Sequence, residues 1–78
     1  MNDDAAIAYA LAAVLEPATG AQVAFIDVFR AVRKYMRDAY GFDVPLGEVK
    51  AVARQAGMRI RKEHDSEYQQ AYDVRLKA

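Results

Sequence analysis

The spacing of the apolar residues changes at Gly57, and this change most restricts the folds open to the chain. Before Gly57, apolar side chains recur every three or four residues, which is the spacing of helices that bury one face. After Gly57, the segments MRIRK (58–62) and YDVRLKA (72–78) alternate apolar and charged residues, which is the period of a strand. We therefore expect an α+β protein in which helices come first and two strands close the sequence.

The chain length of 78 residues predicts a single domain over residues 1–78. There is no cysteine, so neither a disulfide nor a thiolate metal site can stabilise the fold. The apolar run AAIAYALAAVL is shorter than the roughly 20 residues of a membrane-spanning helix. Asp3 and Asp4 occupy the place where a signal peptide carries positive charge. We therefore expect a cytoplasmic protein with no membrane partner.

Two of the three expected helices have clear ends. The first covers about residues 4–16 and stops before Pro17, because the residue before a proline avoids the α conformation. The third runs from about Glu48 to Ala56 and stops at Gly57. Its expected buried face is formed by the apolar residues Val49, Val52, Ala53 and Ala56.

The second helix has a clear end at Tyr40, but its start has two alternatives. The sequence TGAQ, residues 19–22, matches a capping box that would start the helix at Gly20. In the other alternative, residues 22–24 form a short strand and the helix starts near Phe25. The sequence alone does not choose between them.

The two predicted strands enclose the polar stretch EHDSEYQQA, residues 63–71. Two strands separated in this way predict an antiparallel hairpin with a long, exposed loop. An isolated hairpin is marginally stable in water, so we expect it to pack on the helices.

The net charge of zero conceals a basic middle segment. The balances are −4 for residues 1–29, which contain no Lys or Arg, +6 for residues 30–62 and −2 for residues 63–78. An asymmetry of this kind indicates a polyanionic partner, although charges that merely cover a solvated surface give the same pattern.

The order of the predicted elements resembles the winged helix-turn-helix fold, with three helices and a C-terminal β-hairpin as the wing. The segments VAFIDVFRAVRKYMRD, VPLGEVKAVARQAGMRIRK and YDVRLK are similar to the winged-helix modules at the C-termini of phage and plasmid primases. Those modules share an aromatic-rich helix, a short helix ending in Gly and a closing strand with Arg-Leu. This chain departs from them in having Tyr35 or Met36 in place of a tryptophan and in its shorter third helix. The resemblance implies this fold and DNA binding, and it implies nothing about primase chemistry.

The third helix would then be the recognition helix of the helix-turn-helix, whose exposed side chains reach base edges in the major groove. Lys50 and Arg54 are four residues apart and share a face. Arg54 has the chemistry to bind guanine and Gln55 to bind adenine, while Glu48 would repel phosphate. The further DNA-contacting candidates are the basic residues Arg30, Arg33, Lys34 and Arg37 of the second helix and Arg59, Arg61 and Lys62 of the first strand. We also expect the ordinary helical ion pairs Asp27–Arg30 and Lys34–Asp38 to neutralise part of the second helix.

Catalytic chemistry is not expected. His64 is the only histidine, and together with the nearby Ser66 it lacks the third, orienting residue of a triad. One histidine with scattered carboxylates is a poor zinc site, and the four separate glycines form no phosphate-binding loop. We predict no enzyme activity, metal or cofactor.

The sequence therefore predicts a small, regulatory DNA-binding protein encoded by a phage or plasmid. The alternative is a winged-helix module that binds proteins, either by oligomerising or by binding and inhibiting a host protein. The acidic hairpin tip, with Glu63, Asp65 and Glu67, favours this alternative because it would be repelled by DNA.

We also expect a symmetric dimer, because small DNA-binding proteins commonly pair to read two half-sites. Its contact is predicted to involve Val28 and Tyr35 at the margin of the second helix's apolar face. Tyr68 is predicted to be an aromatic anchor, although Tyr68 and Tyr72 could instead close the core beneath the hairpin.

Overall fold

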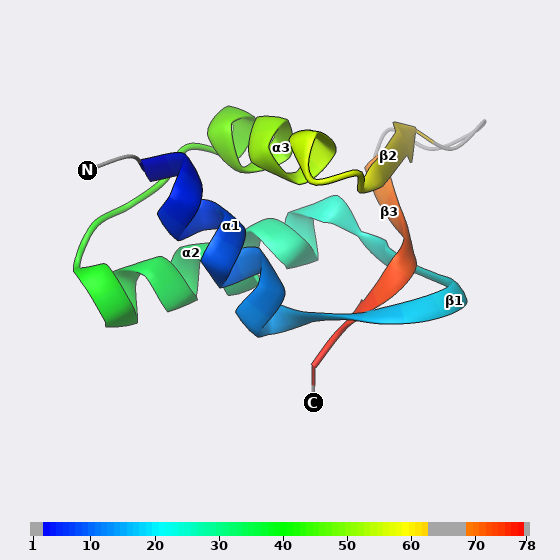
Figure 1. The fold of residues 1–78 in the computed structure, drawn as a ribbon, viewed down its shortest axis with the longest axis horizontal. Helices are drawn as coiled ribbons and strands as arrows, with labels where there is room; N and C mark the ends of the chain where they lie inside the picture. Colours follow the sequence, from blue (N-terminus) through cyan, green and yellow to red (C-terminus); the bar gives the residue numbers. More distant parts are fainter. Residues whose placement is uncertain (1–2, 63–68, 78) are drawn as a thin grey trace.

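The computed structural model describes residues 3–62 and 69–77 (Figure 1). Within these residues the chain forms three helices and a three-stranded antiparallel sheet, so the predicted α+β class is confirmed. In chain order the elements are α1 (Asp3–Val14), β1 (Leu15–Ala24), α2 (Phe25–Tyr40), α3 (Leu46–Gln55), β2 (Arg59–Lys62) and β3 (Gln69–Leu76). The strand order β1-β3-β2 places the last strand at the centre of the sheet.

The segment between α1 and α2 is a strand along its whole length. α1 ends at Val14, two residues earlier than expected, and β1 leads directly into α2 at Phe25. The predicted capping box is therefore wrong: Gly20 lies within β1, and no side chain caps the first turn of α2. The alternative of a strand at residues 22–24 followed by a helix from Phe25 is confirmed. Pro17 is tolerated in β1 because an edge strand does not need every backbone N–H group for pairing.

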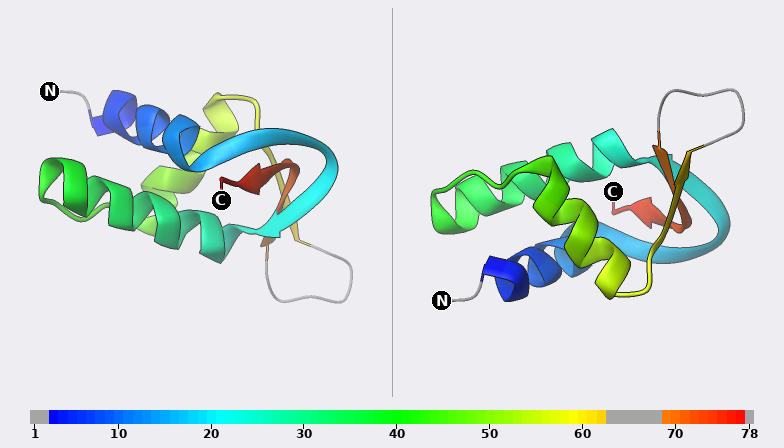
Figure 2. Two further views of the ribbon diagram at one scale, coloured as in Figure 1. Left: turned by 90° about the horizontal axis from the view of Figure 1, so that it is seen from below. Right: turned by 90° about the horizontal axis from the view of Figure 1, so that it is seen from above.

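A large bulge divides the pairing of β1 with β3 into two registers. Residues 15–17 pair with residues 74–76, and residues 22–24 pair with residues 70–72. Residues 18–21 of β1 therefore stand opposite the single residue Asp73 of β3. The surplus residues make β1 curve around the end of the sheet (Figures 1 and 2).

The carboxylate of Asp73 links the two outer strands at this bulge. One oxygen accepts a hydrogen bond from the backbone N–H of Gly20 at 3.0 Å, and the other accepts one from the Arg59 guanidinium at 3.2 Å. Asp73 and Gly20 both have left-handed backbone conformations, with φ of 62° and 83°. Aspartate tolerates this conformation better than most residues with a Cβ atom.

The helices lie at one end of the molecule and the sheet at the other (Figure 2). α1 packs against both α2 and α3, and α2 also contacts β1 and β3. The core is shared among all the elements, and its fully buried large side chains are Ile7, Val28, Val32, Met36 and Val49.

The apolar spacing in the sequence places Phe25, Phe29, Val32 and Met36 on one face of α2. In the structure Phe25, Val32 and Met36 are buried as expected, but Val28 takes the place of Phe29, which is only partly buried at the margin of the core. Val28 has no exposed surface, so the prediction that it contributes to an external dimer contact is wrong. The apolar stripe of α2 is wide enough that either Val28 or Phe29 could occupy its centre. Packing of α2 against α1 and the sheet places Val28 there.

The C-terminal strands pair as an antiparallel hairpin, as predicted. Residues 59–62 pair with residues 69–72, and β3 begins three residues earlier than expected. The acidic tip, His64, Ser66 and Tyr68 lie outside the described residues. The order of elements and the sheet are compatible with winged-helix topology.

We expect Asp73→Val to lower the free energy of unfolding by about 1–3 kcal/mol, because a β-branched residue is strained in the left-handed conformation and both hydrogen bonds are lost. Asp73→Asn is the matched control. Asparagine tolerates this conformation and keeps an acceptor for the Gly20 N–H group, so its loss should be smaller. Urea unfolding measures both variants, and equal losses would show that backbone conformation at Asp73 is unimportant.

Candidate nucleic-acid interface

α3 presents polar side chains on the side away from the core. Val49, Val52 and Ala53 are buried, as predicted, whereas Arg54 and Gln55 are exposed and Lys50 is partly exposed. The expected buried position of Ala56 is wrong. The helix ends at Gln55, so Ala56 is its C-cap and has left the helical row.

A tight turn carries the chain from α3 into β2. The N–H of Met58 donates to the carbonyl of Ala53, and the N–H of Gly57 donates to the carbonyl of Arg54, both at 3.0 Å. These two hydrogen bonds form a Schellman motif, which ends a helix when the residue directly after its C-cap has a left-handed backbone conformation. That residue is Gly57, with a φ of 91°. The turn places α3 and β2 end to end along the upper edge of the molecule in Figure 1.

β2 continues the polar surface of α3. Ile60 is buried against the core, and Arg59, Arg61 and Lys62 are exposed. We define the α3–β2 edge as the polar side chains that follow each other along these two elements: Lys50, Arg54, Gln55, Arg59, Arg61 and Lys62. The structure thus places six of the ten predicted DNA-contacting residues on two elements that follow each other end to end.

Most of the cations of the α3–β2 edge have no carboxylate partner among the described residues. Arg59 is the exception, because it pairs with Asp73 and lies over the ring of Tyr72, 5.9 Å from its centroid. The other four cations, Lys50, Arg54, Arg61 and Lys62, form no ion pair within residues 3–62 and 69–77. Residues 46–62 contain five basic residues and one acidic residue, Glu48, a balance of +4.

The basic residues of α2 are in a different situation, because each has an acidic partner. The two predicted helical ion pairs are confirmed: Asp27–Arg30 at 3.9 Å and Lys34–Asp38 at 3.1 Å. Both pairs are exposed and would exchange readily with solvent ions.

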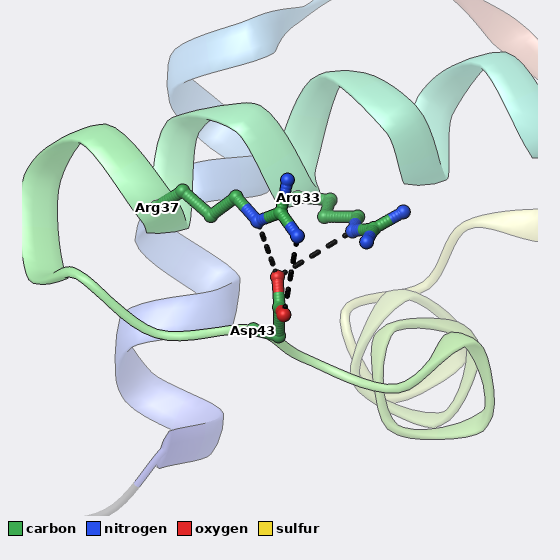
Figure 3. A network of polar contacts seen from close by, with 3 residues as sticks. All are labelled: Arg33, Arg37 and Asp43. Carbon is green, nitrogen blue, oxygen red and sulfur yellow. Dashed lines mark hydrogen bonds and ion pairs between the residues drawn. The ribbon is translucent and has the colours of Figure 1, made fainter.

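Arg33 and Arg37 converge on Asp43, in the loop between α2 and α3 (Figure 3). The Arg37 guanidinium donates to both carboxylate oxygens, at 2.5 and 3.2 Å, and Arg33 Nε donates at 3.5 Å. The hydrogen bond from Arg37 is the main cause of a lowered pKa at Asp43, and it raises the pKa of Arg37. This contact holds the loop against the last turns of α2.

The sequence analysis missed Asp43 because nothing in the helical spacing links it to α2. The available signal was Gly41, which ends α2 in a left-handed conformation and turns the chain back along the helix. With Asp43 included, α2 and its loop hold four basic and three acidic residues, a balance of +1. The α3–β2 edge is therefore the stronger candidate for binding a polyanion.

The remaining predicted contact residues give a mixed result. Tyr35 is partly buried, its ring centroid lies 6.3 Å from that of Tyr9, and burial raises its pKa. Tyr72 is partly buried in β3, beside Arg59. Tyr68 is among the residues that the structure does not describe.

Within the described ranges, no three His, Asp or Glu side chains cluster closely enough to hold a metal ion. None of the helices found there is long and apolar enough to cross a membrane. Comparisons of the chain with protein-family models, curated proteins and solved structures found no significant match. The function must therefore be argued from the geometry and charge of the site.

We expect Asp43→Asn to lower stability at neutral pH and to have little effect in acid. Because the folded-state pKa of Asp43 is lowered, its ion pairs add to stability above a pH of about 4, and this contribution is lost as the pH falls through the folded-state pKa. Urea unfolding at neutral pH and near pH 3 measures the difference between wild type and variant.

The control for this experiment is Asp38→Asn, which removes a carboxylate that meets one lysine rather than two arginines. Its effect should be smaller at neutral pH. A difference between wild type and Asp43→Asn that stays constant across the pH range would contradict the structural role of the Asp43 ion pairs.

Proposed function

We propose that the chain is a winged-helix protein that binds double-stranded DNA through the α3–β2 edge and has a regulatory, non-catalytic role. The observation that carries this proposal is the group of four cations on that edge, Lys50, Arg54, Arg61 and Lys62, without carboxylate partners among the described residues. Phosphate contacts by such cations release counterions from DNA, and this release supplies most of non-specific affinity. The element order and the strand order β1-β3-β2 support the winged-helix assignment.

In this proposal, α3 enters the major groove. Arg54 and Gln55 project from its exposed end and contact base edges, where arginine suits guanine and glutamine suits adenine. Lys50, Arg61 and Lys62 contact phosphates, which position the protein without reading sequence. The cytoplasm is the compartment in which we place this activity, and the resemblance to primase modules supports a phage or plasmid source.

The basic residues of α2 have a secondary role in the proposal. Arg33 and Arg37 are bound to Asp43, so a phosphate would have to displace that carboxylate before reaching them. Arg30 and Lys34 would likewise exchange an acidic partner for a phosphate, which reduces the net gain in attraction.

The second candidate function is a winged-helix module that binds another protein. The zero net charge and the ion-paired surface of α2 favour it, since neither attracts DNA from a distance. The acidic hairpin tip also favours it, although that tip lies outside the described residues. Measured affinity for DNA separates the two functions.

We expect affinity for random duplex DNA to fall steeply with salt. Each phosphate contact adds about 0.9 to the slope of log affinity against log salt, so the three phosphate contacts of Lys50, Arg61 and Lys62 predict a slope near −2.7. Fluorescence anisotropy over a range of salt concentrations measures it. No binding to any duplex at low salt would reject the DNA-binding proposal and leave the protein-binding function.

We expect Arg54→Glu to abolish DNA binding, because the substitution replaces a positive charge with a negative one beside the DNA. The protein should stay folded, because Arg54 is exposed on α3. Arg75→Glu is the matched control. It changes the total charge equally, but Arg75 lies on β3, is paired with Glu16 and is not among the predicted DNA-contacting residues. Equal losses of affinity in the two variants at matched salt would contradict the recognition role of α3.

A further inference from the structure

α1 lacks the charged outer face that a surface helix normally has. No charged residue occurs between Asp4 and Glu16, a span that covers all but the start of the helix. Tyr9 is the most exposed large apolar side chain described, with 64% of its surface accessible. Ala5, Ala8 and Ala12 are exposed beside it. The outer side of α1 is therefore apolar, and in the isolated chain it faces water.

Two grooves lie on either side of this helix face. One, of about 440 Å³, is mainly apolar and runs between α1 and the sheet, with Leu11, Leu15, Met58 and Val74 among its lining residues. The other, of about 400 Å³, runs between α1 and α2 and has a mixed lining, in which Val14, Tyr35 and Leu76 lie beside the charged Lys34 and Asp38. A projecting helix with a groove on each side is self-complementary, because the ridge of one copy fits beside the ridge of another.

The charges at the ends of α1 decide which way a second copy would lie. The helix opens with two consecutive aspartates. At its other end, Lys77 lines both grooves, and its ammonium group donates to the carbonyl of Ala12 at 3.1 Å. Nearby, the charges of Arg75 and Glu16 offset each other in an ion pair. The charge of Lys77 therefore makes the C-terminal end of α1 net positive.

We propose that the outer face of α1 is a homodimer interface, in which the α1 helices of two copies pack antiparallel about a two-fold axis. In this arrangement the acidic start of each α1 faces Lys77 of the other copy. A parallel pair would instead bring the two acidic helix starts together, which opposes association.

The same charges argue against other occupants of this face. Residues 1–29 contain no lysine or arginine, so α1 offers nothing to the phosphates of DNA or to an anionic membrane. None of the residues of the α3–β2 edge takes part in the contact. The two contacts therefore use different side chains, although Ala56 and Met58, in the turn between α3 and β2, line one of the grooves.

The contact should be weak. A helix of 12 residues is about 18 Å long, so a single α1 pair buries less than a standard protein interface. We expect a dimer that forms at micromolar concentrations.

Sedimentation equilibrium of the full chain without DNA tests the proposal, using Ala8→Arg and Ala12→Arg. Arginine forms helices nearly as well as alanine, so circular dichroism should remain unchanged. Ala8→Arg brings two like charges together near the centre of the symmetric contact and should weaken dimerisation by at least about a hundred-fold. Ala12→Arg lies beside the acidic start of the partner helix in the antiparallel arrangement, so it should weaken dimerisation less, through its bulk and desolvation. The control is Ala39→Arg, at an exposed position of α2, which should leave the dimer intact.

A charge exchange tests the antiparallel direction. Lys77→Glu alone and Asp4→Lys alone should each weaken the dimer, and combining them should restore much of the lost affinity. A wild-type chain that remains monomeric at high micromolar concentration would overturn the proposal. A dimer that survives both alanine substitutions, or a double variant without restored affinity, would overturn it as well.

Discussion

The arrangement of the domain depends on β3, which is the last strand in the chain and the central strand of the sheet. β1 and β2 do not pair with each other, so both are held in place by hydrogen bonds to β3. Asp73 strengthens this dependence, because its carboxylate joins Gly20 of β1 to Arg59 of β2 across the strand between them. β2 is held beside the end of α3 by its pairing with β3. The α3–β2 edge therefore forms only when β3 has joined the sheet.

The distribution of carboxylates, rather than that of cations, separates the two basic surfaces. α2 carries four cations and the α3–β2 edge five, but Asp27, Asp38 and Asp43 neutralise most of the charge of α2. A cation already paired gains little when it exchanges one anion for another, whereas an unpaired cation gains the full attraction of a phosphate. Similar basic residues therefore have different roles. Those of α2 form ion pairs within the protein, and most of those of α3 and β2 remain available to a polyanion.

Local spacing predicted α2, α3 and the final hairpin well, because their apolar periods are set by burial of one face. β1 was mostly missed, since Pro17 and Gly20 break any alternation and its partner strand lies more than 45 residues away in sequence. Val28 was misplaced because a wide apolar stripe does not indicate its innermost row. For the site, exposure of Arg54 followed from the helix period. The sequence did not show that Arg54 lacks an acidic partner among the described residues or that Arg33 and Arg37 pair with Asp43. Both facts depend on which segments the fold brings together.

The surfaces of α1 and of the α3–β2 edge have opposite characters, one apolar and one basic. In an antiparallel α1 dimer, the two-fold axis that relates the helices also relates the two α3–β2 edges. Duplex DNA has two-fold axes of its own, so such a dimer would match a sequence with inverted half-sites. Whether both edges reach one duplex depends on their separation meeting a multiple of the helical repeat of about 34 Å. If the separation does not meet it, each edge would engage a separate duplex, and the dimer would join two DNA segments.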